Sequence, residues 1–321
     1  MLDFLCEMGI CPFWPKKPPT HLQTIFLDMN DQLIPGLPND IAHECILRIA
    51  YNNLSKAAYK CKGWKVEIEL PEFLKHRKAA SYSQSIILMV QARVNGNQDC
   101  QSAKYPPMPV YGLIVYEPKM GIWSELLPIP GLSNGLPMFC RLVGLGLDLV
   151  VIGGWDLKTW NMSNNVYIYN FVSATWRLGV DMPGVRRSFF GCACDDDRKV
   201  FVAGGHDDEK NTLKSVIAYD ITKDEWIPLL DMVQEHDECK VIFHRGKLHV
   251  IGGYCTELQG GFEGSVETFD FSTWKWYKVN EDYFGANTCP KACVASDHGK
   301  LYMCRASDVA TLEKDTLKIV A

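Results

Sequence analysis

From residue 85 onward, short runs of apolar residues alternate with polar turn residues. Three of these runs, Leu149–Ile152, Val200–Ala203 and Leu248–Ile251, are each four residues long and are rich in β-branched residues or leucine. A short apolar run bounded by turn residues such as aspartate, glycine and asparagine predicts a β-strand. One unit of the pattern predicts strands at Arg187–Cys194, Val200–Gly204, Val216–Asp220 and Glu225–Pro228.

A glycine doublet follows each of the three apolar runs. The doublets are Gly153-Gly154, Gly204-Gly205 and Gly252-Gly253, so they recur after 51 and 48 residues. An aromatic residue with a tryptophan seven positions later recurs with a similar period. These pairs are Tyr116 with Trp123, Tyr169 with Trp176, Tyr219 with Trp226, and Phe269 with Trp276. The chain is therefore built from repeats of about 50 residues.

Four antiparallel strands per repeat form a sheet that cannot bury both of its faces alone. Neighbouring sheets must stack, and radial stacking of such units gives a β-propeller. The doublets suit strand ends that need a positive φ or a close approach of the backbone, and the aromatic pairs suit packing between blades. The apolar run, doublet, aromatic residue and tryptophan resemble kelch repeats, over residues 85–319. An antiparallel sandwich with coincidental glycines is the alternative.

The N-terminal part shows helical rather than strand periodicity. Ile41, Cys45, Ile46 and Ile49 recur at helical spacing after a proline, which predicts one helix. Two further helices are predicted, one from the stripe Leu54, Ala58, Cys61 and Trp64, and one around Pro71–Tyr82. Three short helices form a small core that is stable chiefly when it packs against something else.

The segments Leu33–Ile41, Cys45–Leu47, Cys61–Trp64 and Pro71–Phe73 resemble an F-box, over residues 33–78. An unrelated helical cap on the propeller is the alternative. An F-box followed by kelch repeats is similar to the plant F-box/kelch-repeat family. Leu33–Pro38 and Arg187–Phe190 look like the subgroup that targets phenylalanine ammonia-lyase and cytokinin type-B response regulators.

Both ends of the chain depart from this pattern. Residues 1–32 form an extension that we expect to be disordered, and Met29 is a plausible alternative start; the F-box helices and linker then span 33–83 and the propeller 84–321. The first unit, which begins at Ser85–Val94, lacks an innermost strand. The last, Lys291–Val320, has Arg305-Ala306 in place of a doublet and Leu317 near the expected tryptophan. We therefore expect an incomplete propeller of four to five blades, open and truncated at its C-terminal end.

Composition narrows the functional class. The chain has 33 basic and 38 acidic residues, a net charge of −5, which disfavours a general nucleic-acid binder. The basic stretch Lys56–Lys78 is better explained as the solvated face of two helices. The longest aliphatic run, Ile86–Val90, is too short for a membrane helix. Thirteen cysteines without a CxxC pair or a secretory signal indicate reduced thiols, hence a protein of the cytoplasm or nucleus.

Motifs for catalysis are weak. The sequence has no GxSxG, P-loop or HExxH motif, and Gly144-Leu145-Gly146 lacks the third glycine of a dinucleotide site. The run His206–Glu209 could ligate a metal, but a solvated turn is the better interpretation. Cys192 and Cys194 lie on one face of a strand as small core residues. We predict no catalysis, no metal and no cofactor; a kelch-type copper oxidase is the enzymatic alternative.

The family resemblance implies protein recognition instead. An F-box implies docking on the Skp1-like adaptor of a cullin ubiquitin ligase, through Leu37, Pro38, Ile41, Leu47 and Ile49. The loops after each doublet and before each innermost strand should share one propeller face and bind the target. The candidate contacts on that face are Trp155, Asp156, Trp160, Arg186, Arg187, His206, Asp207, His236, Asp237, Tyr254 and Glu257. The sequence thus predicts a non-catalytic substrate receptor of an SCF-type ligase, with a kelch scaffold outside any ligase as the rival.

Overall fold

The N-terminal part of the protein is a group of four short helices. The computed structural model describes residues 32–93, 109–132, 135–195, 198–262, 264–279, 290–295, 301–304, 308–313 and 316–319. The helices are α1 (Asn39–Leu47), α2 (Tyr51–Lys60), α3 (Lys62–Glu69) and α4 (Pro71–Ala79). The predicted extension, residues 1–32 with Met29, lies outside the described residues except for its last position. No helix in the described ranges is long and apolar enough to span a membrane.

The remaining described residues form antiparallel sheets that follow one another along the chain. The first sheet holds β1 (Ile87–Arg93), β2 (Val110–Glu117) and β3 (Ile122–Glu125). The second holds β4 (Arg141–Leu145), β5 (Asp148–Ile152), β6 (Val166–Asn170) and β7 (Thr175–Leu178). The third holds β8 (Gly191–Cys194), β9 (Lys199–Ala203), β10 (Val216–Asp220) and β11 (Glu225–Pro228). The fourth holds β12 (Lys240–His244), β13 (Lys247–Ile251), β14 (Val266–Asp270) and β15 (Lys275–Val279). The fifth holds β16 (Ala292–Ala295), β17 (Leu301–Cys304), β18 (Val309–Glu313) and β19 (Thr316–Ile319).

These sheets are the blades of a five-blade kelch-type propeller. The first strands of successive four-stranded blades, β4, β8, β12 and β16, lie next to one another. Within each of the first four blades the aromatic residue and its tryptophan are directly opposite across the last two strands, as in Tyr219 with Trp226. The repeat that the sequence predicts is therefore the structural unit.

Each of three tryptophans also joins its blade to the preceding one. The indole N–H of Trp176 donates to the carbonyl of Leu127 at 2.9 Å. Those of Trp226 and Trp276 donate to Val180 and Leu230, each at 2.8 Å. Because the acceptor lies 46 to 49 residues earlier, the bond crosses one blade boundary. This confirms that the aromatic pairs act between blades.

The glycine doublets allow the backbone of one loop to approach another closely. Both glycines of each doublet have positive φ, for example 66° at Gly204 and 86° at Gly205. A Cβ atom added at Gly154 would lie 2.8 Å from the carbonyl oxygen of Met138. At Gly204 and Gly205 it would collide with the carbonyls of His236 and Ser188. Glycine is thus required at these positions both for the positive φ and for the close approach of the backbone, as the sequence suggests.

The two end blades differ from each other in how well the sequence predicts them. Among the described residues the first blade holds three strands, β1–β3, so a counterpart of the innermost strand β4 is not seen there. The prediction that the last unit is only a fragment, which leaves the propeller truncated and open there, is wrong: β16–β19 form a four-stranded sheet. Leu312 and Leu317 are opposite each other in its backbone register, as the aromatic residue and tryptophan are in other blades. Strand pairing needs neither a doublet nor a tryptophan, so the blade forms without these markers.

Two local boundaries also differ from prediction. The predicted helix through Leu54 and Trp64 is two helices, because Cys61 is extended (φ −143°, ψ 126°) and ends α2 while it begins α3. Gly63, which is a poor helix former, directly follows this break. The predicted strand Arg187–Cys194 begins only at Gly191, because the preceding residues form a loop.

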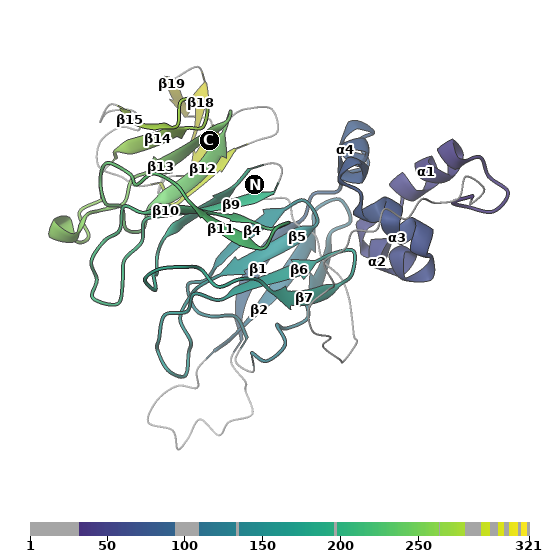
Figure 1. Cartoon of the computed structure of the whole chain (residues 1–321), viewed down its shortest axis with the longest axis horizontal. Helices are drawn as coiled ribbons and strands as arrows, with labels where there is room; N and C mark the ends of the chain where they lie inside the picture. The colour runs from purple at the N-terminus through teal and green to yellow at the C-terminus, as the bar shows by residue number, and fades with distance from the viewer. Residues whose placement is uncertain are drawn as a thin grey trace.

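The helices pack against the end of the propeller that carries the β4–β5 and β6–β7 turns. Ile46, Leu54 and Phe73 belong to the same buried cluster as Leu147 and Phe171 of those turns. The Leu74 side chain lies close to Gly146: a Cβ atom added at Gly146 would be 3.3 Å from Leu74 Cδ1. Figure 1 shows α1–α4 standing to one side of the sheets. In an antiparallel meander the β5–β6 loops lie at the opposite end of the blade, away from these helices.

Candidate recognition face

The loops after each doublet and the loops before each innermost strand lie together, as predicted. Isolated backbone bridges join Met138 to Trp155, Ser188 to His206, and Asp237 to Tyr254. We call this surface the loop face: residues 135–140, 153–165, 179–190, 204–215, 229–239 and 252–262. It is the end of the propeller opposite to the turns that contact the helices.

Side chains directly after two of the doublets bind the next blade. The indole N–H of Trp155 donates to the hydroxyl of Ser188 at 2.6 Å. In the next repeat, His206 Nδ1 lies 2.6 Å from Asp237 Oδ2. Both bonds span just over 30 residues, so they form a repeated latch between neighbouring blades. Sequence reasoning missed this role, although the ring-bearing residue after every doublet is visible in the sequence.

Four of the eleven predicted target contacts are buried, which corrects their assignment to the exposed face. They are Arg187, His206, His236 and Asp237, each at most 4% exposed. Arg187 donates to the carbonyls of Gly204 and Ser215, both at 3.4 Å, and burial lowers the pKa of its guanidinium to about 10. The imidazole of His236 lies 2.8 Å from the carbonyl of Gly252 and 3.2 Å from Glu267. These side chains bind backbone or carboxylate groups that the loops would otherwise bury unpaired.

The other seven lie at the surface to different degrees. Asp156, Trp160, Arg186 and Glu257 are exposed, while Trp155, Asp207 and Tyr254 are partly buried. The Asp156 carboxylate accepts the backbone N–H groups of Lys158 and Thr159, both at 2.8 Å. The N–H groups of Thr159 and Lys158 lower the pKa of this carboxyl group. In the third blade, the Asp207 carboxylate likewise accepts the backbone N–H groups of Glu209 and Asn211 from its own loop. These two aspartates therefore shape their own loops.

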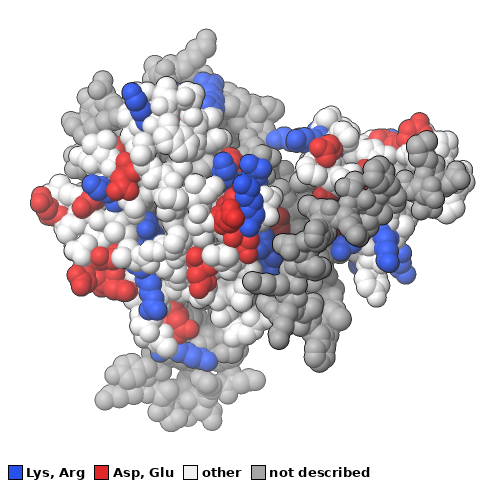
Figure 2. All heavy atoms as spheres, in the orientation of Figure 1, with Lys and Arg blue, Asp and Glu red and all other residues white. Residues whose placement is uncertain are grey.

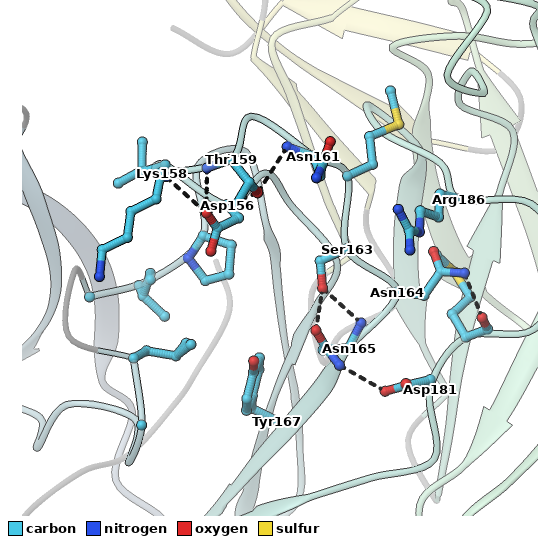
Figure 3. Close-up of a pocket in the computed structure, with 18 residues that line it drawn as sticks. Asp156, Lys158, Thr159, Asn161, Ser163, Asn164, Asn165, Tyr167, Asp181 and Arg186 are labelled. Atoms are coloured by element: carbon cyan, nitrogen blue, oxygen red, sulfur yellow. Dashed lines mark hydrogen bonds between the residues drawn. The ribbon is translucent and has the colours of Figure 1, made fainter.

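A polar cavity of about 540 Å³ opens between the loops of the second blade. Its walls come from the loop that enters β4, the loop between β5 and β6, and the loop that leaves β7. Figure 3 shows Arg186 and Asn164 on one side of this cavity and Lys158 on the other, with Tyr167 below them. We call it the blade-2 pocket.

The side chains that the sequence offers for metal or thiol chemistry have other surroundings in the described part of the chain. Among those residues, no group of three or more His, Cys, Asp and Glu side chains could hold a metal ion. His206 is instead engaged with Asp237, and Lys210 Nζ lies 2.9 Å from its other ring nitrogen. Burial raises the pKa of the Cys192 thiol, which keeps it protonated at neutral pH. Gly144 lies within β4 and Gly146 in the turn after it, so neither opens a helix.

The predicted adaptor contacts divide into surface and core positions. Ile41 is 48% exposed and Pro38 is exposed, whereas Leu37 and Ile49 are partly buried. Leu47 is only 4% exposed and belongs to the core, which corrects its assignment as a surface contact. The α-helices expose further apolar side chains at Tyr59, Val66 and Leu70.

A buried arginine ties the ends of the helices together. Arg77 of α4 is 4% exposed and donates to the carbonyls of Leu47 and Ile49, both at 2.6 Å, and of Tyr82 at 3.0 Å. These carbonyls follow the ends of α1 and α4, where helices leave acceptors unpaired. Gln84 then connects the helical part to the first blade through the N–H of Tyr51 and the carboxylate of Glu117. The helices are thus fixed firmly to the propeller.

Repeats, blades and loop face together define a kelch propeller with a helical N-terminal module. Kelch-motif family models match residues 139–183, 186–232 and 236–282. The solved structure of YjhT is similar over 74% of this chain and 81% of that chain, with a TM-score of 0.53 and 11% identity, which shows the fold alone.

Full-length relatives define the family. The F-box/kelch-repeat protein At1g80440 of Arabidopsis thaliana is 47% identical over 287 residues, 88% of this chain and 80% of that protein. At1g15670 of the same plant is 47% identical over 288 residues, and SKIP20 is 30% identical over 304 residues. These alignments cover 89% and 84% of this chain, and 80% and 71% of the two proteins. The chain belongs to the F-box/kelch-repeat proteins.

Proposed function

We propose that this protein is the substrate-recognition subunit of an SCF-type ubiquitin ligase. In this role α1–α4 bind a Skp1-like adaptor, and through it the cullin, while the loop face binds a target protein for ubiquitination. The observation that carries the proposal is the opposite placement of these two surfaces. The helices pack at the end with the β4–β5 turn, and the loops gather at the other end.

The exposed apolar side chains of the helices support the adaptor half of the proposal. Ile41 of α1, Val66 of α3 and the adjoining Leu70 are between 40% and 48% exposed although the same helices have a well-packed core. Apolar side chains exposed together on a small helical module are typical of a surface that a partner covers. His43 Nε2 lies 2.7 Å from Glu67 Oε1, and this contact joins α1 to α3.

The adaptor interface can be tested with Ile41→Asp. A carboxylate buried in an apolar contact costs several kcal/mol, so we expect the variant to lose at least about a hundredfold in affinity for a purified Skp1-like adaptor. The matched control is Leu178→Asp on β7, because Leu178 is 50% exposed and Ile41 48%. The control should bind the adaptor normally. Wild-type affinity of Ile41→Asp would reject the assigned surface, and no binding by the wild-type chain would favour a kelch scaffold outside any ligase.

The family resemblance suggests the first targets to examine. Phenylalanine ammonia-lyase and type-B response regulators are the candidates, and the compartment in which they would be met is the cytoplasm or the nucleus. Purified candidates should be captured by wild-type chain and by Ile41→Asp alike, because the altered residue lies on the helical module. Failure of both candidates would leave the adaptor role intact and remove this target assignment.

A further inference from the structure

The blade-2 pocket has the dimensions of a ligand site rather than of a packing defect. Its volume of about 540 Å³ lies within the usual range of such sites. Its buried apolar residues are Leu136, Leu157, Met162 and Met182, each at most 5% exposed. The other side chains that line it are mostly polar, and they come from three different loops. A pocket of this size accepts a few residues of a peptide but not a folded domain.

The two acidic side chains of the pocket already have donors. Asp156 accepts two backbone N–H groups and the hydroxyl of Thr159 within its own loop. Asp181 accepts the side-chain amide of Asn165 at 3.0 Å. Neither carboxylate therefore needs a cationic ligand. The two negative charges nevertheless remain at the walls, where they oppose a ligand group with two negative charges.

Several donors of the pocket, by contrast, have no partner among the described residues. The Arg186 guanidinium makes no hydrogen bond or ion pair there, although it can donate five N–H groups. The Tyr167 hydroxyl and the Asn161 side-chain amide are also without a described partner. Burial, together with the charges of Asp181 and Asp156, raises the pKa of Tyr167, so its hydroxyl stays protonated and can donate.

One buried acceptor completes the set. The side-chain amide of Asn164 donates its N–H to the carbonyl of Met182 at 2.8 Å. Its oxygen Oδ1 is shielded from solvent and has no hydrogen-bond partner among the described residues. A buried acceptor left unpaired costs free energy, which a ligand N–H group would recover once the Asn164 side chain turns this oxygen toward the pocket. Asn164 and Arg186 line the same pocket, so one ligand could engage both side chains.

We propose that the blade-2 pocket binds a carboxylate of the target peptide, with Arg186 as its principal partner and Asn164 accepting a neighbouring peptide N–H. This inference rests on the proposed function, because it specifies what the loop face recognises. A guanidinium donates to both oxygens of a carboxylate at once. A singly charged carboxylate also fits better than a phosphate dianion, because Asp156 and Asp181 repel negative charge.

Trp160 supplies an apolar contact on the loop that lines the pocket. Its backbone N–H donates to the carbonyl of Asp156 at 2.8 Å, so the loop is a fixed turn. The residue has a positive φ of 55° and is 55% exposed. Exposed tryptophans are frequent among the residues that dominate binding energy. In the next blade the corresponding turn carries Lys210, which folds back over Trp155 at 5.4 Å and leaves no such exposed ring.

The test uses the full chain and four libraries of fluorescent nonapeptides. The central residue is fixed as Glu or Gln, the C-terminus is free or amidated, and the other positions exclude Asp and Glu. We expect a library with a carboxylate to bind at least about tenfold more tightly than the Gln, amidated library, since a charge-assisted hydrogen bond contributes this much. Comparison of the Glu-amidated and Gln-acid libraries shows whether a side-chain or a C-terminal carboxylate is preferred.

Two variants and one control make the test specific. Arg186→Gln should abolish the preference for carboxylate, while Trp160→Ala should weaken carboxylate and amide peptides by the same factor. The control Lys223→Gln removes one charge from the exposed turn between β10 and β11, at the other end of the blade, and should behave as wild type. Equal binding of all libraries, or an unchanged preference in Arg186→Gln, would overturn the inference. Adaptor binding, measured on the same samples, tests the proposed function separately, because Arg186 lies far from the helices in the fold.

Discussion

Trp226 and Trp123 hold equivalent positions in two blades but have different surroundings. Trp226 is partly buried against the core between the second and third blades, 4.9 Å from the Tyr219 ring, and donates to the carbonyl of Val180. Trp123 stacks on Tyr116 at 4.4 Å, is 56% exposed and has no described hydrogen-bond partner. A comparison of variants at these two tryptophans therefore separates the contribution of the inter-blade contact from that of the tyrosine–tryptophan contact within a blade.

The difference can be estimated from these contacts. Replacement of a fully buried tryptophan by alanine costs about 3–5 kcal/mol, and partial burial reduces the packing part for Trp226 to about 2 kcal/mol. The hydrogen bond to Val180 adds about 1 kcal/mol. We thus expect Trp226→Ala to lower the free energy of unfolding by about 3 kcal/mol and Trp226→Phe to lower it by about 1.5 kcal/mol. Trp123→Ala should lower it by about 1 kcal/mol, which is the contribution of an aromatic pair.

Urea unfolding of the full-length chain, followed by far-ultraviolet circular dichroism, measures these differences. The midpoint should fall most for Trp226→Ala and least for Trp123→Ala, with similar slopes, since a changed slope would indicate a loss of two-state behaviour. Equal losses for the two alanine variants would refute the reasoning, because the inter-blade contact would then contribute nothing. If Trp226→Phe lowered the free energy of unfolding as much as Trp226→Ala does, the contribution assigned to packing of the Trp226 ring would be refuted.

Two further predictions concern Arg187 and His249. Arg187→Glu should reduce soluble yield and lower the free energy of unfolding by about 3–5 kcal/mol, because Arg187 is 3% exposed and a buried unpaired carboxylate is costly. Arg186→Glu at the exposed neighbouring position should leave the urea midpoint unchanged. Equal midpoints for the two variants would show that Arg187 does not serve the core. Burial lowers the pKa of His249 to about 4 from an ordinary value near 6.5, so the unfolded chain binds the extra proton first and stability falls as the pH drops from 6.5 to 4. The free energy of unfolding that His249 loses over this pH range is up to about 3 kcal/mol. The difference in urea midpoint between wild type and His249→Gln should therefore shrink from pH 6.5 to pH 4. A difference that does not change with pH would contradict the assignment.

Much of the fold follows from the sequence because the repeat is marked by residues with special backbone or packing needs. A doublet such as Gly204-Gly205 is required where two loops nearly touch. A tryptophan such as Trp226 is required where a blade bonds its neighbour. Residues with such requirements recur at a fixed spacing in the sequence and so reveal the repeat. The strands predicted from it at Val216–Asp220 and Glu225–Pro228 agree with β10 and β11.

The last blade shows where this reasoning ends. The fifth sheet has Arg305-Ala306 where a doublet was expected and Leu317 near the tryptophan position. Its strands still pair, with Leu312 opposite Leu317. Backbone hydrogen bonds between strands depend little on side-chain identity, and sheet formation tolerates many apolar residues. The absence of a marker residue is therefore weak grounds for predicting the absence of a blade.

The binding face was harder to predict because a polar loop residue can serve either the loop or a ligand. Arg186 and Arg187 are adjacent in sequence, yet one is exposed at a pocket and the other is bonded to the carbonyls of Gly204 and Ser215. Only the folded path of the third blade, where Gly204 follows β9 and Ser215 precedes β10, decides which arginine meets those carbonyls. The same holds for Asp156, whose carboxylate is used by its own turn. Among the predicted contacts on the loops around the blade-2 pocket, Arg186 and Trp160 have no side-chain partner in the described part of the chain, and this is why the recognition hypothesis rests on them.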